Sequence, residues 1–213
     1  MNLKTISVFG IIAPIIFVVT IVVGGLTTPG YSHLSQSISE LVMSGAPNKL
    51  YLDISFSINY VFSCIFGFGL LVIFRSKASP LNSPTGLVGF IILGVIAVLS
   101  FLSSNFFPMN LPGTPPTTSG TIHLTLVGLE SIGSMVAILL IGLWFKKVGL
   151  SRHSVYSIIT LTIVFITGIV TLVATTQGSS YVGLFERLTI GAFALWSFVV
   201  ALKFHDFTPG LQT

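Results

Sequence analysis

Charge is what this sequence lacks most: only 7% of its 213 residues are Asp, Glu, Lys or Arg, while 53% are hydrophobic. Soluble globular domains carry about 25% charged residues. The deficit excludes a soluble fold and predicts a multi-pass protein of the cell membrane. Cysteine is almost absent too. The single Cys64 lies in an apolar run, which excludes an intramolecular disulfide and a cysteine-based zinc site.

Basic residues are too few for nucleic acid. The net charge is +4, but the nine lysines and arginines are scattered along the chain. Nucleic-acid binding needs them clustered as a footprint for phosphates. The sequence therefore predicts no nucleic-acid partner.

Six apolar runs are long enough to cross a bilayer core, which takes about 20 helical residues. The first is too long for the apolar part of a signal peptide, and it ends without a small-residue cleavage signature. The sequence thus predicts an all-α bundle of six transmembrane helices, forming a single domain over residues 1–213. The runs lie near 5–27, 51–74, 85–104, 122–145, 154–176 and 185–204.

The lysines and arginines divide unequally between the two sides of such a bundle. Only Lys49 and Arg187 fall on the side opposite the termini. Cytoplasmic loops of membrane proteins carry the excess of basic residues, so both termini are predicted to be cytoplasmic. The seven on that side are Lys4, Arg75, Lys77, Lys146, Lys147, Arg152 and Lys203.

The first outer loop carries an amphipathic pattern. Ser37 and Glu40 fit a capping box, in which the two residues satisfy each other's backbone N–H groups. Ala46-Pro47-Asn48 then ends the pattern. The spacing predicts a short helix that lies in the outer membrane interface. Its apolar members are Tyr31, Leu34, Ile38, Leu41 and Val42.

Stripes of small and polar residues run along two of the predicted helices. Such residues let membrane helices approach closely and bond to one another, which favours a packing role. Asn59 is larger than its neighbours and is a candidate for ligand binding. The stripes are Ser55, Asn59, Ser63 and Gly67, and Thr160, Thr167, Thr171 and Thr175.

The ionisable groups gather toward the outer side. His123 and Glu130 are seven residues apart, so they share one helix face, with Glu130 roughly 10 Å deeper. Ser134 continues that face. A carboxyl at that depth nearly always faces the bundle interior and a partner. We expect Arg187 or His123 to be that partner, with Arg187 pointing inward among carboxylates and Glu186 inward or toward water.

The loop 105–121 is rich in proline and free of charge, which denies it regular structure. Irregular backbone near a membrane is tolerated where protein covers it or where it lines a wet cavity. The loop is therefore expected to fold over the bundle as a lid or rim; a flexible tether is the alternative. The candidate ligand-binding residues are His33, Glu40, Asn59, Asn110, His123, Glu130, Glu186 and Arg187.

Three stretches carry a family resemblance: "YSHLSQSISELVMSGAPN", "FFPMN…G…H" and "GLFERLTIGAFALW". Together they resemble a family of uncharacterised six-helix membrane proteins of bacteria and archaea, the domain of unknown function nine-nine-eight. The resemblance covers nearly the whole chain and implies a six-helix fold with a shared outward site. The family often has an aspartate two residues after the proline, where this chain has Asn110. That departure weakens a metal-ligand role for the loop.

Three functional classes remain open. The first is a protein whose outward polar pocket binds a membrane lipid, another amphiphile or a partner membrane protein. The second is an intramembrane lipid hydrolase, with His123, Glu130 and Glu40 as candidate catalytic residues and His123 and Glu130 as candidate metal ligands. The chain lacks a compact H-E-x-x-H motif for it. The third is a small transporter or a haem-binding subunit. The lack of inverted repeats speaks against transport, and against haem stands that only His33 and His123 share the outer side, with His33 in a loop.

Overall fold

The computed structural model describes residues 1–75, 82–111 and 113–206. Within these residues it is all-helical, with six long helices and no strand. All six are long and apolar enough to cross a membrane, so the chain is a multi-pass membrane protein. Each begins slightly earlier than the hydropathy pattern predicts. The elements are α1 (Leu3–Thr27), the 3-10 helix η1 (Ile38–Val42), α2 (Lys49–Phe74), α3 (Pro84–Phe106), α4 (Thr118–Lys147), α5 (Ser151–Thr176) and α6 (Val182–His205).

Local sequence signals set several helix ends. Pro84 occupies the first turn of α3, where its missing N–H costs no hydrogen bond. The Thr117 side chain accepts the backbone N–H of Gly120 at 3.1 Å and so caps the start of α4. Gly149 turns the chain from α4 to α5 with a φ of 80°, a left-handed conformation that glycine adopts without steric cost.

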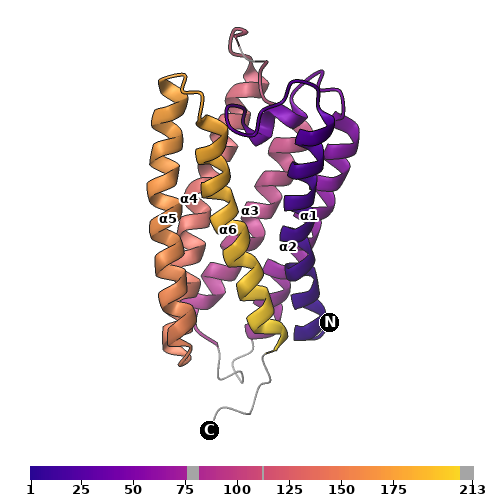
Figure 1. Ribbon diagram of the computed structural model, residues 1–213. Helices are drawn as coiled ribbons and strands as arrows, with labels where there is room; N and C mark the ends of the chain where they lie inside the picture. The colour runs from indigo at the N-terminus through magenta and orange to yellow at the C-terminus, as the bar shows by residue number, and fades with distance from the viewer. Residues whose placement is uncertain (76–81, 112, 207–213) are drawn as a thin grey trace.

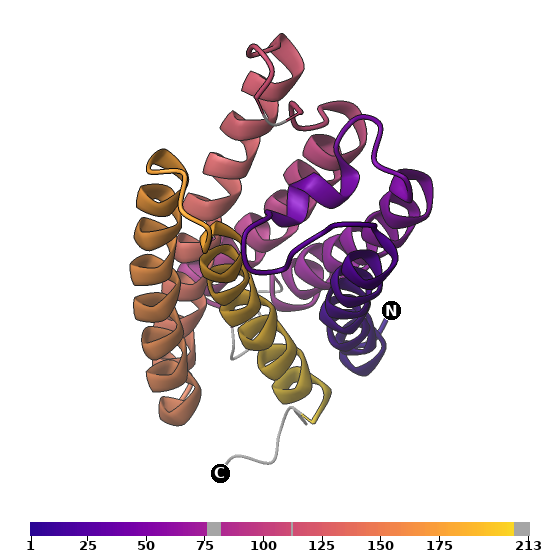
Figure 2. The same cartoon turned by 45° about the horizontal axis from the view of Figure 1, so that its top comes forward.

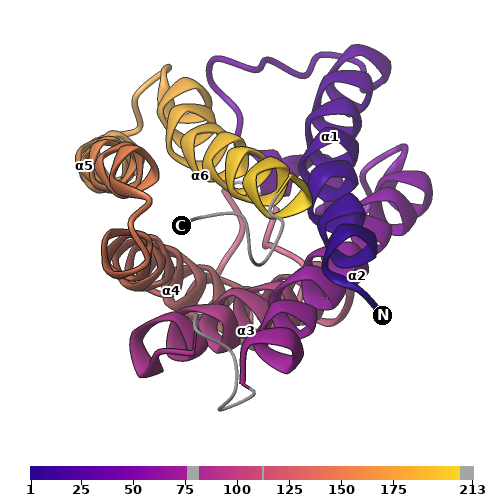
Figure 3. The ribbon, with the colours of Figure 1, turned by 90° about the horizontal axis from the view of Figure 1, so that it is seen from below.

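The helices form a ring. Each packs against the next along the chain, and α6 closes the ring against α1, as Figure 3 shows from below. The N-terminus and the end of α6 lie at one end (Figure 1), which we call the terminal end. At the opposite, capped end, residues 28–48 cross the ring (Figure 2), and we call them the cover loop. The cytoplasmic placement of the terminal end stays a prediction.

Aromatic side chains fill the ring at the terminal end. Trp144 lies at the centre of this group, with ring centroids 5.7, 5.5 and 5.6 Å from those of Phe74, Phe90 and Phe204. Phe145 completes the group, and all five are at most 2% exposed. Burial of this much aromatic surface closes that end of the ring. We call these five residues the aromatic plug.

Small residues bring neighbouring helices together, as the predicted stripes indicate. A Cβ added at Gly67 of α2 would lie 2.5 Å from the backbone nitrogen of Gly94 in α3. Between α5 and α6, the Thr189 hydroxyl donates to Thr167 Oγ1 at 2.9 Å. Trp196 is buried and donates to Ser157 Oγ at 2.9 Å. Close backbones and hydroxyl bonds are the usual means of helix association in membranes.

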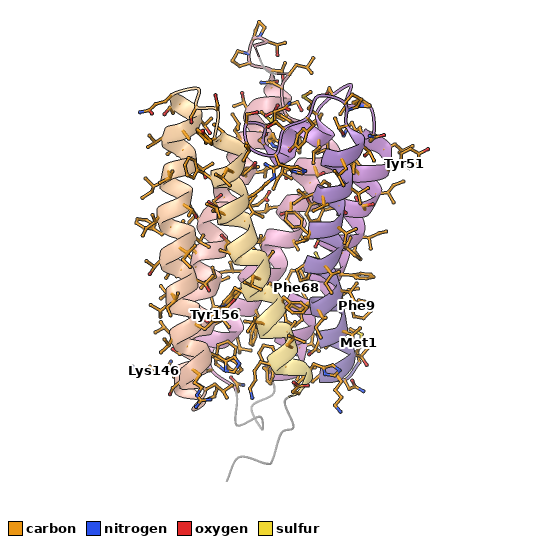
Figure 4. All side chains as sticks on the ribbon, viewed as in Figure 1. Met1, Phe9, Tyr51, Phe68, Lys146 and Tyr156 are labelled. Carbon is orange, nitrogen blue, oxygen red and sulfur yellow. The ribbon has the colours of Figure 1, made fainter. Side chains whose placement is uncertain are left out.

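Large apolar side chains cover the outside of the ring, as a lipid-facing surface requires. Val19 of α1, Val72 of α2 and Ile166 of α5 are 53%, 57% and 55% exposed. Figure 4 shows Tyr51 projecting from the bundle near the capped end and Lys146 at the terminal end. Tyrosine and lysine are residues that membrane proteins place toward the two interfaces.

Candidate functional site

Three apolar residues of the cover loop face inward, whereas Leu34 is 52% exposed. Regular helix is confined to η1, where Ile38, Leu41 and Val42 are buried against a cluster that includes Leu52 and Phe56 of α2. The sequence predicts an amphipathic helix with this apolar face in the membrane interface. In the structure Ile38, Leu41 and Val42 of that face instead pack on the bundle, because the ring offers apolar surface directly beneath them.

Glu40 stabilises the cover loop from within. It forms the predicted capping box with Ser37, accepting the Ser37 backbone N–H at 2.9 Å. Its other carboxyl oxygen accepts from Gln36 Nε2 at 3.0 Å. Both oxygens are thereby used inside the loop. This arrangement gives Glu40 a structural role.

Arg187 ties the cover loop to α6. Its Nη1 donates to the backbone oxygens of His33 at 2.9 Å and Gln36 at 2.8 Å, and Nη2 bonds the Tyr31 hydroxyl. The expectation that Arg187 pairs with Glu130 is wrong, although the guanidinium does lie close enough to Glu186 for the two charges to interact. The loop presents several carbonyl oxygens together, and a guanidinium with five N–H donors can serve them at once.

The same contacts change how two loop side chains ionise. Burial is the main cause that raises the pKa of the Tyr31 hydroxyl to about 12, although Arg187 opposes the shift. Partial burial, together with the charge of Arg187, lowers the pKa of His33 below its ordinary value. Both side chains are therefore neutral near pH 7. Neither side chain therefore adds a charge beside the Arg187 guanidinium.

Glu186 forms a second hydrogen-bonded contact between α6 and the cover loop. Its Oε2 accepts the backbone N–H of Ile38 at 2.7 Å, at the start of η1. Adjacent residues on a helix point about 100° apart, so Glu186 and Arg187 reach the loop at separate points. Glu186 also lines the space beneath the loop.

His123 joins three parts of the chain. It is 4% exposed, its Nδ1 lies 2.8 Å from the Phe107 backbone oxygen, and its Nε2 lies 3.2 Å from Ser39 Oγ. A carbonyl oxygen only accepts, so Nδ1 donates to it, and in the neutral ring Nε2 accepts from Ser39. Both ring nitrogens of His123 are thus occupied by protein groups.

Glu130 finds its partners on α3. Its two carboxyl oxygens accept the hydroxyls of Ser100 at 2.7 Å and Ser103 at 3.0 Å. The predictions that Arg187 or His123 would pair with it are wrong, because Arg187 is held by the loop and His123 by Phe107 and Ser39. The missed signal was the spacing of the two serines, which puts them on one face of α3.

A cavity of about 570 Å³ occupies the centre of the ring beneath the cover loop. All six helices and η1 contribute to its wall. Most of the wall is apolar, and Phe66 and Leu93 belong both to it and to the core above the aromatic plug. His123, Glu130 and Ser134 all line it, as their shared face predicts. The remaining polar lining includes Ser39, Asn59, Tyr60, Ser100, Ser103, Ser104 and Glu186.

The cavity reaches the outer surface of the ring between α4 and α5. Its lining includes Ile132 of α4 and Ile169 and Leu172 of α5, which are 59%, 48% and 65% exposed. Figure 2 shows α4 diverging from α5 toward the capped end. These side chains are apolar and belong to membrane-spanning helices, so the gap between them faces lipid. We call it the lateral opening.

The proline-rich loop forms a rim at the capped end of the ring. The cover loop, not this loop, is the lid over the cavity. The rim is anchored where the Ser119 hydroxyl donates to the Pro108 backbone oxygen at 3.2 Å. Asn110 accepts from the Thr117 hydroxyl at 2.5 Å and packs against Gly120, so it shapes the rim. Residues 113–118 are exposed.

The candidate binding residues therefore separate into three groups. Asn59, His123, Glu130 and Glu186 line the cavity. His33, Glu40 and Arg187 build or hold the cover loop, and Asn110 shapes the rim. Over the described part of the chain, no three His, Cys, Asp or Glu side chains gather closely enough to hold a metal ion.

Sequence comparison agrees with the resemblance of the motifs. The family described as "Protein of unknown function (DUF998)" matches residues 11–203, a range that reaches from α1 to α6, so the chain belongs to this family. No curated protein and no solved structure matches the chain.

Proposed function

We propose that this member of the DUF998 family binds an amphiphile of the cell membrane in its central cavity. The observation that carries the proposal is a cavity within a membrane-spanning ring that is open sideways to lipid. Ligand sites are concave, mostly apolar, of roughly 300–1,000 Å³, and hold a few polar groups that fix orientation. A cavity of about 570 Å³ with such a wall fits this description.

The wall suggests how the ligand lies. Ser39 of the cover loop and Glu186 of α6 line the cavity at its capped end, and Glu130 lines it on the α4 side. Exposed apolar residues border the lateral opening. We place the polar headgroup among these polar side chains and the apolar tail in the lateral opening, where it remains in contact with lipid.

The distribution of basic residues suggests which leaflet supplies the ligand. Lys4, Arg75, Lys146 and Arg152 belong to the terminal end. The positive-inside rule then sets that end in the cytoplasm and the cover loop outside. The lateral opening lies toward the capped end, so the amphiphile enters from the outer leaflet.

A bulky residue in the opening tests the proposal. Gly128 of α4 lines the cavity, and an added Cβ there would meet nothing within 4 Å. Gly191 of α6 is a matched control because it is also helical, exposed and uncrowded. We expect wild type and Gly191→Phe to retain about one amphiphile per chain after purification in mild detergent. Gly128→Phe should retain much less, as measured by native mass spectrometry.

Two results would contradict the proposal. One is a wild-type protein that carries no stoichiometric amphiphile under conditions that preserve its fold. The other is a partner membrane protein that co-purifies with wild type, is lost in Gly128→Phe, and is accompanied by no bound amphiphile. That second result would assign the lateral opening to a protein partner.

A further inference from the structure

In the described part of the chain, no cation pairs with the Glu130 carboxyl. It lies in a membrane-spanning helix, lines the cavity, and has only the hydroxyls of Ser100 and Ser103 as hydrogen-bond partners in the described part of the chain. The ion pairs found there involve Asp53 and Asp206 instead. Ionisable groups inside a membrane span are costly, and they mark ligand or ion sites when no protein partner neutralises them.

The described part of the cavity wall offers no lysine or arginine to an anionic ligand. Among the described residues, the charged side chains that line it are two acids, Glu130 and Glu186, with no lysine or arginine. The nearby Arg187 donates to loop carbonyls. Phosphate and carboxylate ligands are recognised by arginine or lysine. An anionic headgroup therefore does not suit this wall.

The same wall contains a buried hydroxyl, that of Ser104, that lacks a hydrogen-bond partner among the described residues. Ser104 is 5% exposed and lines the cavity. Its Oγ lies near the Tyr60 hydroxyl but has no hydrogen-bond partner of acceptable geometry in the described residues. A buried hydroxyl left unpaired costs free energy. A donor-rich ligand in the cavity would satisfy it.

We infer that the ligand's headgroup carries an ammonium group, and that Glu130 receives it. This inference rests on the proposed binding function. A carboxylate has about four lone-pair sites, and the two serines occupy two of them. The remaining sites can accept N–H bonds from an ammonium, and Ser104 Oγ in the same wall can accept a bond from another donor of the headgroup. The charge-assisted bond would select a long-chain amine over a neutral or anionic amphiphile of equal length.

Three probes with the same tail test this selection: dodecylamine, dodecanol and dodecyl phosphate. Each is titrated into full-length protein in phosphatidylcholine nanodiscs, and its apparent affinity is read from the rise in melting temperature. We expect wild type to bind dodecylamine about tenfold or more tightly than dodecanol, and dodecyl phosphate most weakly. Glu130→Gln should bind dodecylamine and dodecanol about equally.

Two further variants test whether the amine preference depends on the Glu130 carboxylate in particular. Glu40→Gln alters a carboxyl that is used inside the cover loop, so it should keep the amine preference. Glu130→Asp keeps the charge but withdraws it by one methylene. This variant should weaken dodecylamine binding and leave dodecanol binding unchanged. It tests the same assignment if Glu130→Gln does not fold.

The outcomes separate the two proposals. Equal affinity for all three probes in wild type, or a preference for dodecyl phosphate, would overturn the ammonium assignment but leave the cavity as an amphiphile site. An amine preference that survives in both Glu130 variants would also overturn it. Absence of binding by every probe would instead contradict the proposed function itself.

Discussion

Arg187 Nη1 lies 2.8 Å from the backbone oxygen of Gln36, although 151 residues separate the two along the chain. The same guanidinium reaches His33 and Tyr31. One side chain of α6 therefore holds the cover loop over the mouth of the ring. Because these bonds run to backbone and hydroxyl oxygens, they depend on the fork geometry of arginine as well as on its charge.

Arg187→Lys should loosen the cover loop. A lysine ammonium keeps the charge but cannot reach several divergent acceptors from one planar group. Bonds to charged groups contribute about 1.5–3 kcal/mol each, so we expect a lower melting temperature and faster hydrogen exchange over residues 31–42. Arg152→Lys, an exposed change at the start of α5, is the control. Equal exchange in both variants would contradict the role given to Arg187.

Ser100 and Ser103 should matter only while Glu130 is present. Replacing both by alanine leaves the carboxyl without its hydroxyl donors, which we expect to cost about 1–3 kcal/mol of stability. The same pair of changes in a Glu130→Leu background should cost much less. A double-mutant cycle of thermal stability in detergent measures this coupling.

Ser131→Ala provides the control for that cycle. Its hydroxyl donates to the Val127 backbone oxygen of its own helix at 2.8 Å, so its loss should not depend on Glu130. A coupling energy near zero for the serine pair would show that the contacts with Glu130 do not contribute to stability.

Gly67→Ala should separate α2 from α3. The new Cβ would lie 2.5 Å from the backbone nitrogen of Gly94, and backbone cannot yield as a flexible side chain does. Overpacking of this kind costs about 1–3 kcal/mol. Gly191→Ala, with nothing within 4 Å of its added Cβ, should be neutral or slightly stabilising. Similar melting temperatures for the two variants would contradict the close approach of the helices.

The sidedness can be tested with single cysteines in a Cys64→Ser background. Thr114→Cys lies in the exposed rim at the capped end, and Ser151→Cys is the exposed first residue of α5 at the terminal end. The positive-inside rule predicts that a membrane-impermeant thiol reagent labels only Thr114→Cys on intact cells. The reverse pattern would turn the cavity toward the cytoplasm and assign the ligand to the inner leaflet.

Features that depend on local composition and helical period were predictable from the sequence. Long apolar runs gave the six helices, since a bilayer span needs a fixed length of apolar helix. The capping box of Ser37 and Glu40 follows from a three-residue spacing. The seven-residue spacing of His123 and Glu130 correctly put both on the face of α4 that lines the cavity.

The partners of the polar side chains could not be read in the same way. Ser100 and Ser103 meet Glu130 because of how α3 and α4 are rotated against each other. Arg187 could equally have bonded to Glu130, as the sequence suggested, but the cover loop places its carbonyl oxygens within reach. The apolar face of η1 could have packed against lipid as well as against protein.

The sequence by itself determined the membrane spans, their order and the helix faces that carry polar groups, because helix length and period are set by neighbouring residues along the chain. The tertiary structure alone decided that the ring stays hollow beneath the cover loop, opens between α4 and α5, and pairs Glu130 with no cation among the described residues. Those properties depend on helix tilt and rotation, which packing between distant segments sets and which no local pattern records.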